Sequence, residues 1–285
     1  MFKNVLILWS ITSMLGLSEL SAQNFTFGVG FGGMNYQGEL TSGGLGEILQ
    51  ITNPAFKLSL TYPLSDHLEF SLSGVFGKIE GDDRLSRIQY RKERNLNFVS
   101  KINEFAVSAE YNFLSFSGDF ADYRFTPFIE AGVGVFFFDP KTYFLTQEVR
   151  LQPIGTEGQG LIQFPERQKY KLSGLVIPFG AGAKLRLNDK MTISLALDCH
   201  LTFTDYLDDV STKYVNYNDL LAGNGPLSAA LGNRTGEYFG TAPVDTPSGG
   251  KRGTSSNNDF YYTAFLSLHT QIFGWASNVK GCPRF

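Results

Sequence analysis

Cysteine, positive charge and long apolar runs are all scarce in this sequence. Only two cysteines occur in 285 residues, so this is not a small secreted scaffold held together by disulfides. Lysine and arginine number 24 against 27 aspartates and glutamates, a balance that does not support nucleic-acid binding, which depends on cations that neutralise phosphates. Beyond the N-terminus, no segment has the roughly 18 consecutive apolar residues of a membrane-spanning helix, so helical membrane spans are excluded.

The N-terminus has the pattern of a secretory signal. A lysine precedes an apolar stretch at residues 5–17, and small residues follow at Ser21 and Ala22. The stretch is interrupted by polar residues and is shorter than the roughly 20 residues that span a bilayer. We therefore predict a signal peptide at residues 1–22, with a membrane anchor as the alternative.

Glycine and aromatic residues are abundant, and apolar and polar side chains alternate along much of the chain. The sequence has 31 glycines and 26 phenylalanines, a composition that suits strands and membrane-interface girdles. Period-two alternation predicts strands with one apolar face. It occurs in eight segments, residues 25–34, 55–62, 68–77, 104–113, 128–137, 174–186, 191–203 and 260–272. Each is close to the roughly 9 to 11 residues that a tilted strand needs to cross a bilayer.

The connections distinguish a membrane barrel from a soluble sandwich, whose strands also alternate. Short connections at 63–67, 114–125 and 187–190 interleave with long ones at 35–54, 78–103, 138–173 and 206–259. This asymmetry is typical of bacterial outer-membrane barrels. We predict an all-β protein, an eight-stranded antiparallel transmembrane β-barrel over residues 23–273. Its long loops would be extracellular, its two mature ends periplasmic, and residues 274–285 a periplasmic tail.

The polar faces of the strands predict a packed ionic interior. The apolar faces would contact lipid, and eight strands enclose a space just wide enough for side chains to fill. Small inward residues, glycines 28, 30, 32, 132, 134, 180 and 182, would make room for long charged ones. The predicted lumen network comprises Lys57, Glu69, Glu104, Glu110, Glu130, Lys184, Arg186, Asp198, His200 and His269. Pro178 cannot donate to the strand ladder, and we expect a bulge there.

Asp198 and His200 lie two residues apart on one face and resemble part of an acid–base pair. No nucleophile elbow or other catalytic motif accompanies them. We interpret them as buried charges that Lys184 or Arg186 neutralises. We therefore expect no catalytic residues, no cofactor and no enzymatic activity.

Carboxylates gather in two of the long connections. Asp205, Asp208 and Asp209 follow the seventh strand, and Glu157 lies in "GTEGQG". Carboxylate oxygens are ligands for calcium, although the spacing is not that of an EF-hand loop. A metal site is one hypothesis, and helix capping or loop hydrogen bonding is the other.

The segment from Gly223 to Asn258 is rich in turn formers and poor in apolar residues. We expect it to be a mobile surface loop rather than a second domain.

The two cysteines fall in different environments. Cys199 lies on the lipid-facing side of a strand, where a thiol behaves as a small apolar group. Cys282 lies in the predicted periplasmic tail, so the two cannot meet. An unpaired thiol in an oxidising compartment invites an intermolecular bond. We hypothesise that Cys282 crosslinks to a periplasmic partner; the alternative is an unreactive tail thiol.

Six segments together resemble one known family. They are "NYQGEL" (35–40), "RNLNFVSKINEFAVSAEYNF" (94–113), "GTEGQG" (155–160), "IPFGAGAKL" (177–185), "TFTDYLDDVSTKYV" (202–215) and "RGTSSNNDFYY" (252–262). In order and spacing they are similar to the PorG-type outer-membrane barrel of the type IX secretion system. The resemblance implies a non-enzymatic barrel that associates with a periplasmic ring built from a lipoprotein, PorK, and its companion, PorN. It implies a role in protein export and, in some relatives, in gliding motility.

Two other functions stay open at this point. An outer-membrane lipid hydrolase would need a histidine and a serine near the outer rim facing lipid, and His200 is predicted to point inward. A surface adhesin or envelope-stability barrel would use the long outer loops. The segments that carry the resemblance fall on those outer loops, whereas the implied partners are periplasmic. Either the loops serve folding or another contact, or the strand directions are inverted.

Overall fold

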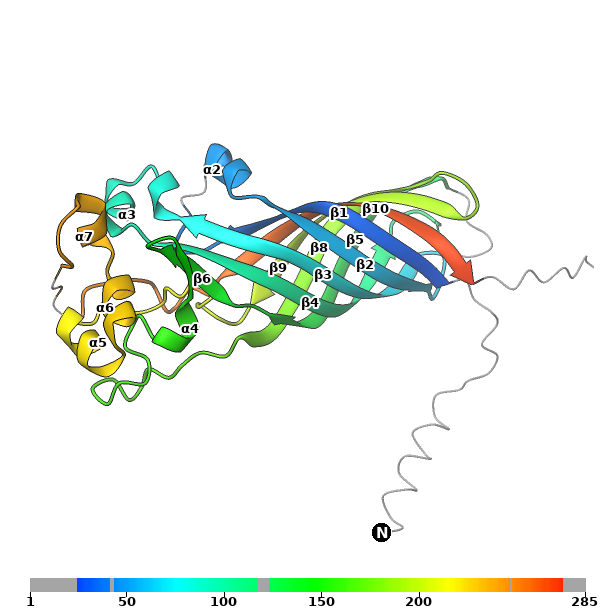
Figure 1. The fold of residues 1–285 in the computed structure, drawn as a ribbon. Coiled ribbons are helices and arrows are strands. Elements are labelled where there is room, and N and C mark those ends of the chain that lie inside the picture. Colours follow the sequence, from blue (N-terminus) through cyan, green and yellow to red (C-terminus); the bar gives the residue numbers. More distant parts are fainter. Residues whose placement is uncertain (1–24, 42–43, 117–122, 245, 247, 274–285) are drawn as a thin grey trace, which may run out of the picture.

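Most of the regular secondary structure consists of ten strands (Figure 1). The computed structural model describes residues 25–41, 44–116, 123–244, 246 and 248–273. Its strands are β1 (Phe25–Gln37), β2 (Asn53–Pro63), β3 (Leu68–Asp82), β4 (Asn97–Asn112), β5 (Phe125–Phe137), β6 (Pro140–Phe144), β7 (Gln147–Arg150), β8 (Ser173–Arg186), β9 (Met191–Thr202) and β10 (Phe260–Phe273). The predicted signal peptide and the tail with Cys282 lie outside the described residues.

Eight of these strands close into an antiparallel barrel, which confirms the predicted fold. The order β3-β2-β1-β10-β9-β8-β5-β4 is completed by pairing of β4 with β3. The first and last strands pair as well, with Phe25 opposite Phe273. The short hairpin of β6 and β7 continues from β4 beyond the barrel wall. A closed sheet leaves no row of unpaired backbone groups, the condition for a strand structure in lipid.

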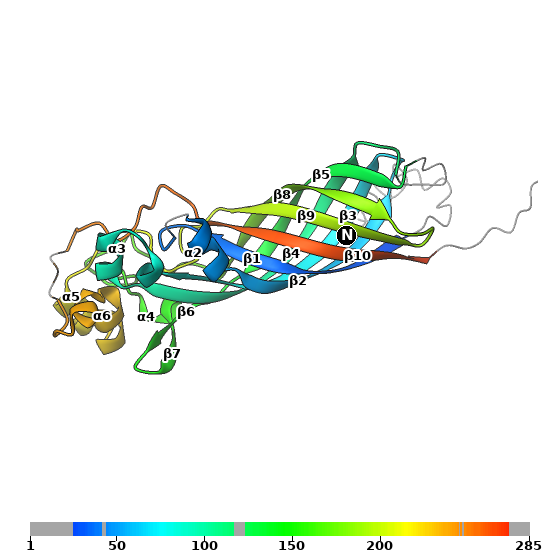
Figure 2. The ribbon, with the colours of Figure 1, turned by 90° about the horizontal axis from the view of Figure 1, so that it is seen from above.

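All short connections lie at one end of the barrel and all long ones at the other (Figures 1 and 2). The short ones are residues 64–67, 113–124 and 187–190, and the long ones are 38–52, 83–96, 138–172 and 203–259. Both ends of the barrel chain, near Phe25 and Phe273, lie at the short-turn end. The barrel therefore has the asymmetric shape of outer-membrane barrels.

The alternating residues of each strand lie on opposite faces of the barrel wall. Outward side chains are apolar and exposed, with Phe31 68% and Val133 67% accessible, whereas inward Glu104 is 1% accessible. Such an exposed apolar band is what a membrane-spanning barrel presents to acyl chains. Among the described residues, no helix is long and apolar enough to cross a bilayer.

The bulge predicted at Pro178 is absent. β8 keeps one register with β9 through Ile177, Pro178 and Phe179. On the other side the register with β5 is the same before and after the proline, but the pairs opposite Ile177 and Pro178 are missing. The proline, which has no N–H, therefore interrupts the pairing with β5 locally. No extra residue is inserted into β8, so the prediction of a bulge is wrong.

Half of the barrel interior is apolar, which the predicted ionic lumen did not include. Toward the long-loop end, inward side chains form a buried cluster that includes Met34, Tyr36, Val75, Ile79, Phe98, Ile102, Phe136, Val176, Tyr261 and Phe265. Several of them have no accessible surface. Ser194, His269 and the Lys184 ion network lie toward the short turns, and the Lys57 network lies near the middle of the barrel. His200 and Glu104 are an exception, because they lie against Tyr261 of the apolar cluster.

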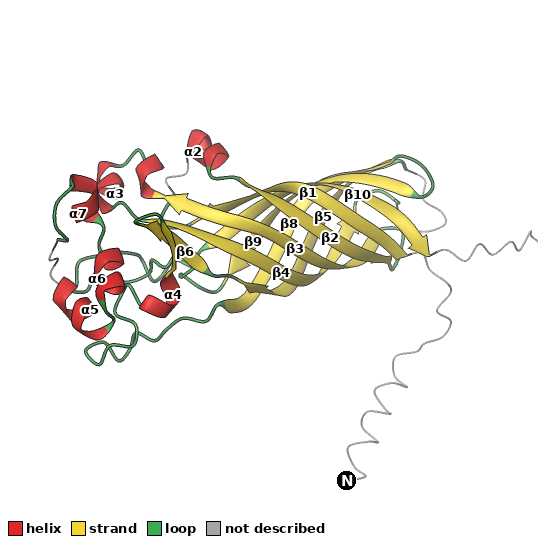
Figure 3. Ribbon diagram, in the orientation of Figure 1, coloured by secondary structure: helices red, strands yellow, loops and turns green. Residues whose placement is uncertain are grey.

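The long connections fold into a cap over one end of the barrel (Figure 3). Its helical elements are α2 (Leu45–Gln50), η1 (Asp83–Leu85), α3 (Gln89–Arg94), α4 (Leu151–Ile154), α5 (Tyr217–Gly223), α6 (Pro226–Gly232) and α7 (Thr235–Phe239). Arg234 and Arg252 are buried within it. The prediction of a mobile surface loop between Gly223 and Asn258 is wrong, since this segment contains α6 and α7 and is held by buried apolar side chains, Ala229 and Leu231, as well as by the two arginines.

Candidate functional site

Two lysines organise the acids of the lower barrel interior. Lys57 Nζ lies 3.3 Å from Glu130 Oε1 and 3.4 Å from Asp198 Oδ2. The cation expected for Asp198 was Lys184 or Arg186, but the structure supplies it from β2. Lys184 instead reaches across to Glu69, at 2.6 Å, and to Glu110. Each lysine therefore ties together acids from separate strands inside the barrel.

A second group of polar side chains surrounds His200, one of the two inward histidines. His200 Nδ1 lies 2.8 Å from Glu104 Oε2, and its Nε2 lies 3.0 Å from the Thr263 hydroxyl. Its ring stacks on Tyr261, whose hydroxyl donates to the same glutamate. Both ring nitrogens of His200 are thus occupied within the wall. This geometry belongs to a satisfied interior residue rather than to a free acid–base group.

Ser194 and His269 form a pair that sequence reasoning missed. Ser194 Oγ lies 2.8 Å from His269 Nε2, across the β9–β10 pairing. A serine beside a histidine is part of a hydrolase nucleophile arrangement. Here Ser194 is 5% accessible and faces the lumen, so lipid outside the wall does not reach it. The pair gives no support to lipid hydrolysis.

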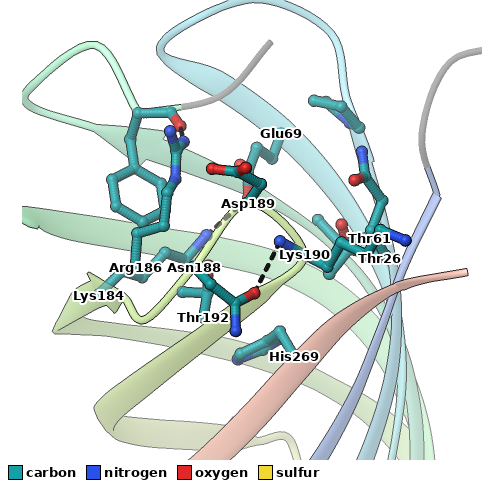
Figure 4. A pocket seen from close by; sticks show the side chains of 13 residues that line it. Thr26, Thr61, Glu69, Lys184, Arg186, Asn188, Asp189, Lys190, Thr192 and His269 are labelled. Carbon is teal, nitrogen blue, oxygen red and sulfur yellow. Dashed lines mark hydrogen bonds and ion pairs between the residues drawn. The ribbon is translucent and has the colours of Figure 1, made fainter. Parts of the chain in front are cut away.

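Arg186 lies apart from these networks, at the short-turn mouth. Its guanidinium donates to the Phe116 carbonyl and sits 4.8 Å from the centre of the Phe116 ring. Figure 4 shows it beside Lys184, Asn188 and Asp189 around a cavity of about 330 Å³. The cavity is lined mainly by polar side chains and is continuous with the ionic half of the interior.

The cap contains a buried network centred on Arg252. Its Nη1 donates to Glu157 Oε1 at 2.8 Å and to the Asp209 carbonyl at 2.6 Å. Glu157 also accepts backbone N–H groups of Ser211 and Thr212, both at 2.9 Å. Burial raises the pKa of Asp209 to about 6, against the opposing effect of the Arg252 charge. Two of the sequence-predicted metal candidates, Glu157 and Asp209, are therefore held by an arginine.

The other two candidates, Asp205 and Asp208, belong to a separate cluster at the barrel rim. The Tyr36 hydroxyl lies 2.6 Å from Asp208 Oδ2 and 3.0 Å from Asp259 Oδ1. One hydroxyl hydrogen cannot serve both oxygens at once, so the second contact calls for a protonated carboxyl group. Burial raises the pKa of both aspartates well above the usual range, which agrees with that requirement.

Three carboxylates of this rim converge on one point. One oxygen each from Glu39, Asp205 and Asp259 lies within 4.8 Å of the others. Burial and then the charge of Glu39 raise the pKa of Asp205 to about 8, and the nearby Ser211 hydroxyl offsets this only in part. Sequence reasoning missed Glu39 and Asp259. Their positions relative to the predicted strands were the available signal. Glu39 follows β1 and Asp259 precedes β10, and these two strands pair with each other. Because β10 also pairs with β9, the strand that Asp205 follows, all three residues lie at the same end of adjacent strands.

Cys199 lies on the outward face of β9, paired with Tyr262 of β10. It is a free thiol. The proposed crosslink at Cys282 concerns a residue outside the described part of the chain.

Solved structures with a similar fold are small outer-membrane barrels. Neisserial surface protein A is 8% identical, with 87% of this chain and 97% of that chain covered and a TM-score of 0.43. Ail of Yersinia pestis is 8% identical, with 88% and 99% covered and a TM-score of 0.39. The outer membrane enzyme PagL is 14% identical, with 87% and 99% covered and a TM-score of 0.33. At these values the likenesses do not bear on function.

No curated protein matches the sequence. A family model does match, over residues 4–228, and its description is "Domain of unknown function (DUF6089)". The match covers most of the chain, which therefore belongs to the DUF6089 family.

Proposed function

We propose that this chain is a non-enzymatic outer-membrane barrel of the type IX protein secretion machinery, similar to PorG. Its role would be to anchor or position a periplasmic ring of PorK- and PorN-like proteins. The single observation that supports this most is the convergence of the resembling segments in one buried structure. Glu157 of "GTEGQG" and Asp209 and Arg252 of the two later segments form one buried network in the cap, and Tyr36 of "NYQGEL" binds Asp208 in the rim cluster directly below it.

The filled interior limits what such a component can do. Phe136 and Phe265 close the upper lumen without accessible surface, and two lysine-centred ion networks fill the lower half. A folded protein does not pass through an eight-stranded barrel of this kind. The chain would therefore hold or position other parts of the machine and would not itself be the export channel.

The short-turn end is the face proposed to meet the ring. The first and last barrel strands begin and end there, and the tail after Phe273 would emerge at the same place. In this orientation the cap lies outside the cell and the short turns lie in the periplasm, as in other outer-membrane barrels. Of the turn at residues 115–124, positions 117–122 lie outside the described residues.

Affinity purification of the tagged full chain from detergent-solubilised membranes of its own host tests the proposal. Co-purification of the ring lipoprotein and its companion, absent with an unrelated tagged barrel, supports it. Deletion of the gene should also leave cargo proteins inside the cell. If no ring protein co-purifies and secretion is intact in the deletion strain, the proposal is wrong. Altered lipid A in that strain would point to a hydrolase, and loss of adhesion or envelope integrity to a surface barrel.

The tail thiol gives a second test of the same contact. If Cys282 crosslinks to a periplasmic partner, non-reducing gels of whole cells will show a high-mass band that Cys282→Ser abolishes. The matched control is Cys199→Ser, because this thiol faces outward from the barrel wall. An unchanged band pattern in the Cys282 variant would end the crosslink hypothesis.

A further inference from the structure

The rim of the barrel under the cap gathers four carboxyl groups without an ion-paired cation in the described part of the chain. Glu39, Asp205, Asp208 and Asp259 lie together, and no lysine or arginine of the described ranges forms an ion pair with any of them. Arg94 and Arg252, the buried cations nearby, are committed to Asp83 and to Glu157. Buried charges are stable only when they are paired or when they coordinate a metal.

Asp205 is the residue that the protein alone leaves unsatisfied. Its side chain is buried, with 6% of the residue accessible, and neither carboxylate oxygen accepts a hydrogen bond of ordinary geometry from the described part of the chain, although the Ser211 hydroxyl lies nearby. Buried polar atoms almost always have a partner, so two such oxygens on one side chain indicate that a partner is missing. Both Glu39 and Asp259 present an oxygen to the same point.

We propose that Glu39, Asp205 and Asp259 bind a calcium ion at the rim of the barrel. Calcium is a hard cation that takes oxygen ligands at roughly 2.3–2.6 Å, so one ion bridges oxygens that lie within 4.8 Å of one another. The donor set contains carboxylates only, without the nitrogen or sulfur ligands that zinc prefers. Water would complete the six to eight ligands that calcium usually takes.

Existing contacts orient two of the ligands. Glu39 Oε1 accepts the Thr254 N–H at 3.0 Å, and Asp259 Oδ2 accepts the Leu207 N–H at 3.0 Å. Carboxylate oxygens have further lone pairs for a metal. Such outer contacts fix the direction of a ligand before the ion arrives.

The position of the site gives the ion a structural role. Asp205 follows the end of β9, Asp259 precedes β10, and Glu39 follows the end of β1. These strands are neighbours in the barrel. A calcium ion would therefore fasten both ends of the 203–259 connection to the first long loop, and so hold the cap on the barrel.

The test uses the full mature chain in detergent, freed of metal with a chelator and then titrated with calcium chloride alone by calorimetry. We expect one calcium per chain. Asp205→Asn should weaken binding by roughly tenfold or more, since one of three carboxylates loses its charge. Asp219→Asn, a change in α5 outside the cluster, should bind as the wild type does. Glu39→Gln provides a second ligand variant at a less buried position.

Hydrogen exchange of residues 203–215 and 253–259 separates a metal site from a merely structural carboxylate. Calcium should slow exchange there in the wild type and in Asp219→Asn. In chelator, Asp205→Asn should exchange no faster than the wild type, because Asp205 forms no ion pair with the described residues that the substitution would break. The inference is overturned if the wild type binds no calcium, or if both ligand variants bind it with unchanged affinity.

Discussion

Replacing Arg252 by methionine should release the cap while leaving the barrel closed. The guanidinium is buried and makes hydrogen bonds to Glu157, to the Asp209 carbonyl and to the Gly232 carbonyl. Methionine fills part of the same space but leaves the fully buried Glu157 without a cation. Removing one partner of a buried ion pair costs about 3–5 kcal/mol. The three hydrogen bonds that Glu157 keeps from Ser211 and Thr212 favour the lower end of that range.

The expected readout is local opening of residues 203–259, measured by hydrogen exchange in detergent. A loss of about 3 kcal/mol corresponds to roughly hundredfold faster exchange where opening limits the rate. Strand amides of the barrel should keep their protection. Lys251→Met is the matched control, because Lys251 is exposed and adjacent in sequence.

A double variant decides whether the lost ion pair is the cause. Arg252→Met with Glu157→Gln removes both charges, so it should be less destabilised than the single change. The reasoning is refuted if the double variant is as unstable as Arg252→Met, or if Arg252→Met exchanges no faster than Lys251→Met.

Three further changes test other parts of the fold. Gly132→Val should impair barrel closure, measured by heat-dependent gel mobility, because even a Cβ there would lie 2.5 Å from the Val107 carbonyl oxygen, whereas Gly46→Val meets nothing within 4 Å. Lys57→Met should lower the thermal midpoint of the barrel by leaving two acids without their cation, at a cost of about 3–5 kcal/mol, and the exposed Lys101→Met should not. Cap stability should fall as pH rises from about 4 to about 6, because the raised pKa of Asp209 favours the protonated form in the folded state and contributes about 1.4 kcal/mol per unit. Asp209→Asn should lower the slope by that amount when cap exchange is measured across that range, whereas the raised pKa values of Asp205, Asp208 and Asp259 leave a remaining slope.

Each of these predictions has an outcome that contradicts it. Equal folding yields of the two glycine variants would show that the wall tolerates a side chain at position 132. Equal midpoints of the two lysine variants would mean that the interior acids do not need Lys57. A pH slope that is equally steep with and without the Asp209 carboxyl would assign the whole effect to other buried acids of the cap.

The barrel wall could be predicted from the sequence because each strand faces lipid on one side and the closed barrel interior on the other. Lipid outside and a closed interior impose period two, and all eight predicted segments correspond to strands. The same rule did not reveal the apolar upper interior, where inward residues such as Phe136 and Phe265 are as hydrophobic as the outward ones. In that part of the strands, apolar and polar residues do not alternate. β3 and β4 also extend further toward the cap than the alternation predicted.

The cap could not be derived in the same way, because its stability comes from pairs far apart in the sequence. Arg252 meets Glu157 across 95 positions, and Tyr36 meets Asp259 across 223. Glycine- and serine-rich composition favours a mobile loop, and nothing local indicates that one buried arginine will organise it. The acidic residues were visible as candidates, but only the structure divides them into an arginine-held group and a group without a cation.

That division also bears on where a partner would dock. Three cap residues of the resembling segments, Arg252, Asp208 and Asp209, are almost fully buried, so a partner at the cap surface would not touch them. Folding of the cap is a sufficient reason for the presence of these residues. The proposed ring contact would then fall to the opposite end, where the short turns and both barrel termini lie together. Substitutions in the turn at 187–190 should then weaken ring binding without opening the cap, whereas Arg252→Met should open the cap and leave ring binding intact. The reverse result would place the ring contact on the cap and invert the orientation of the barrel.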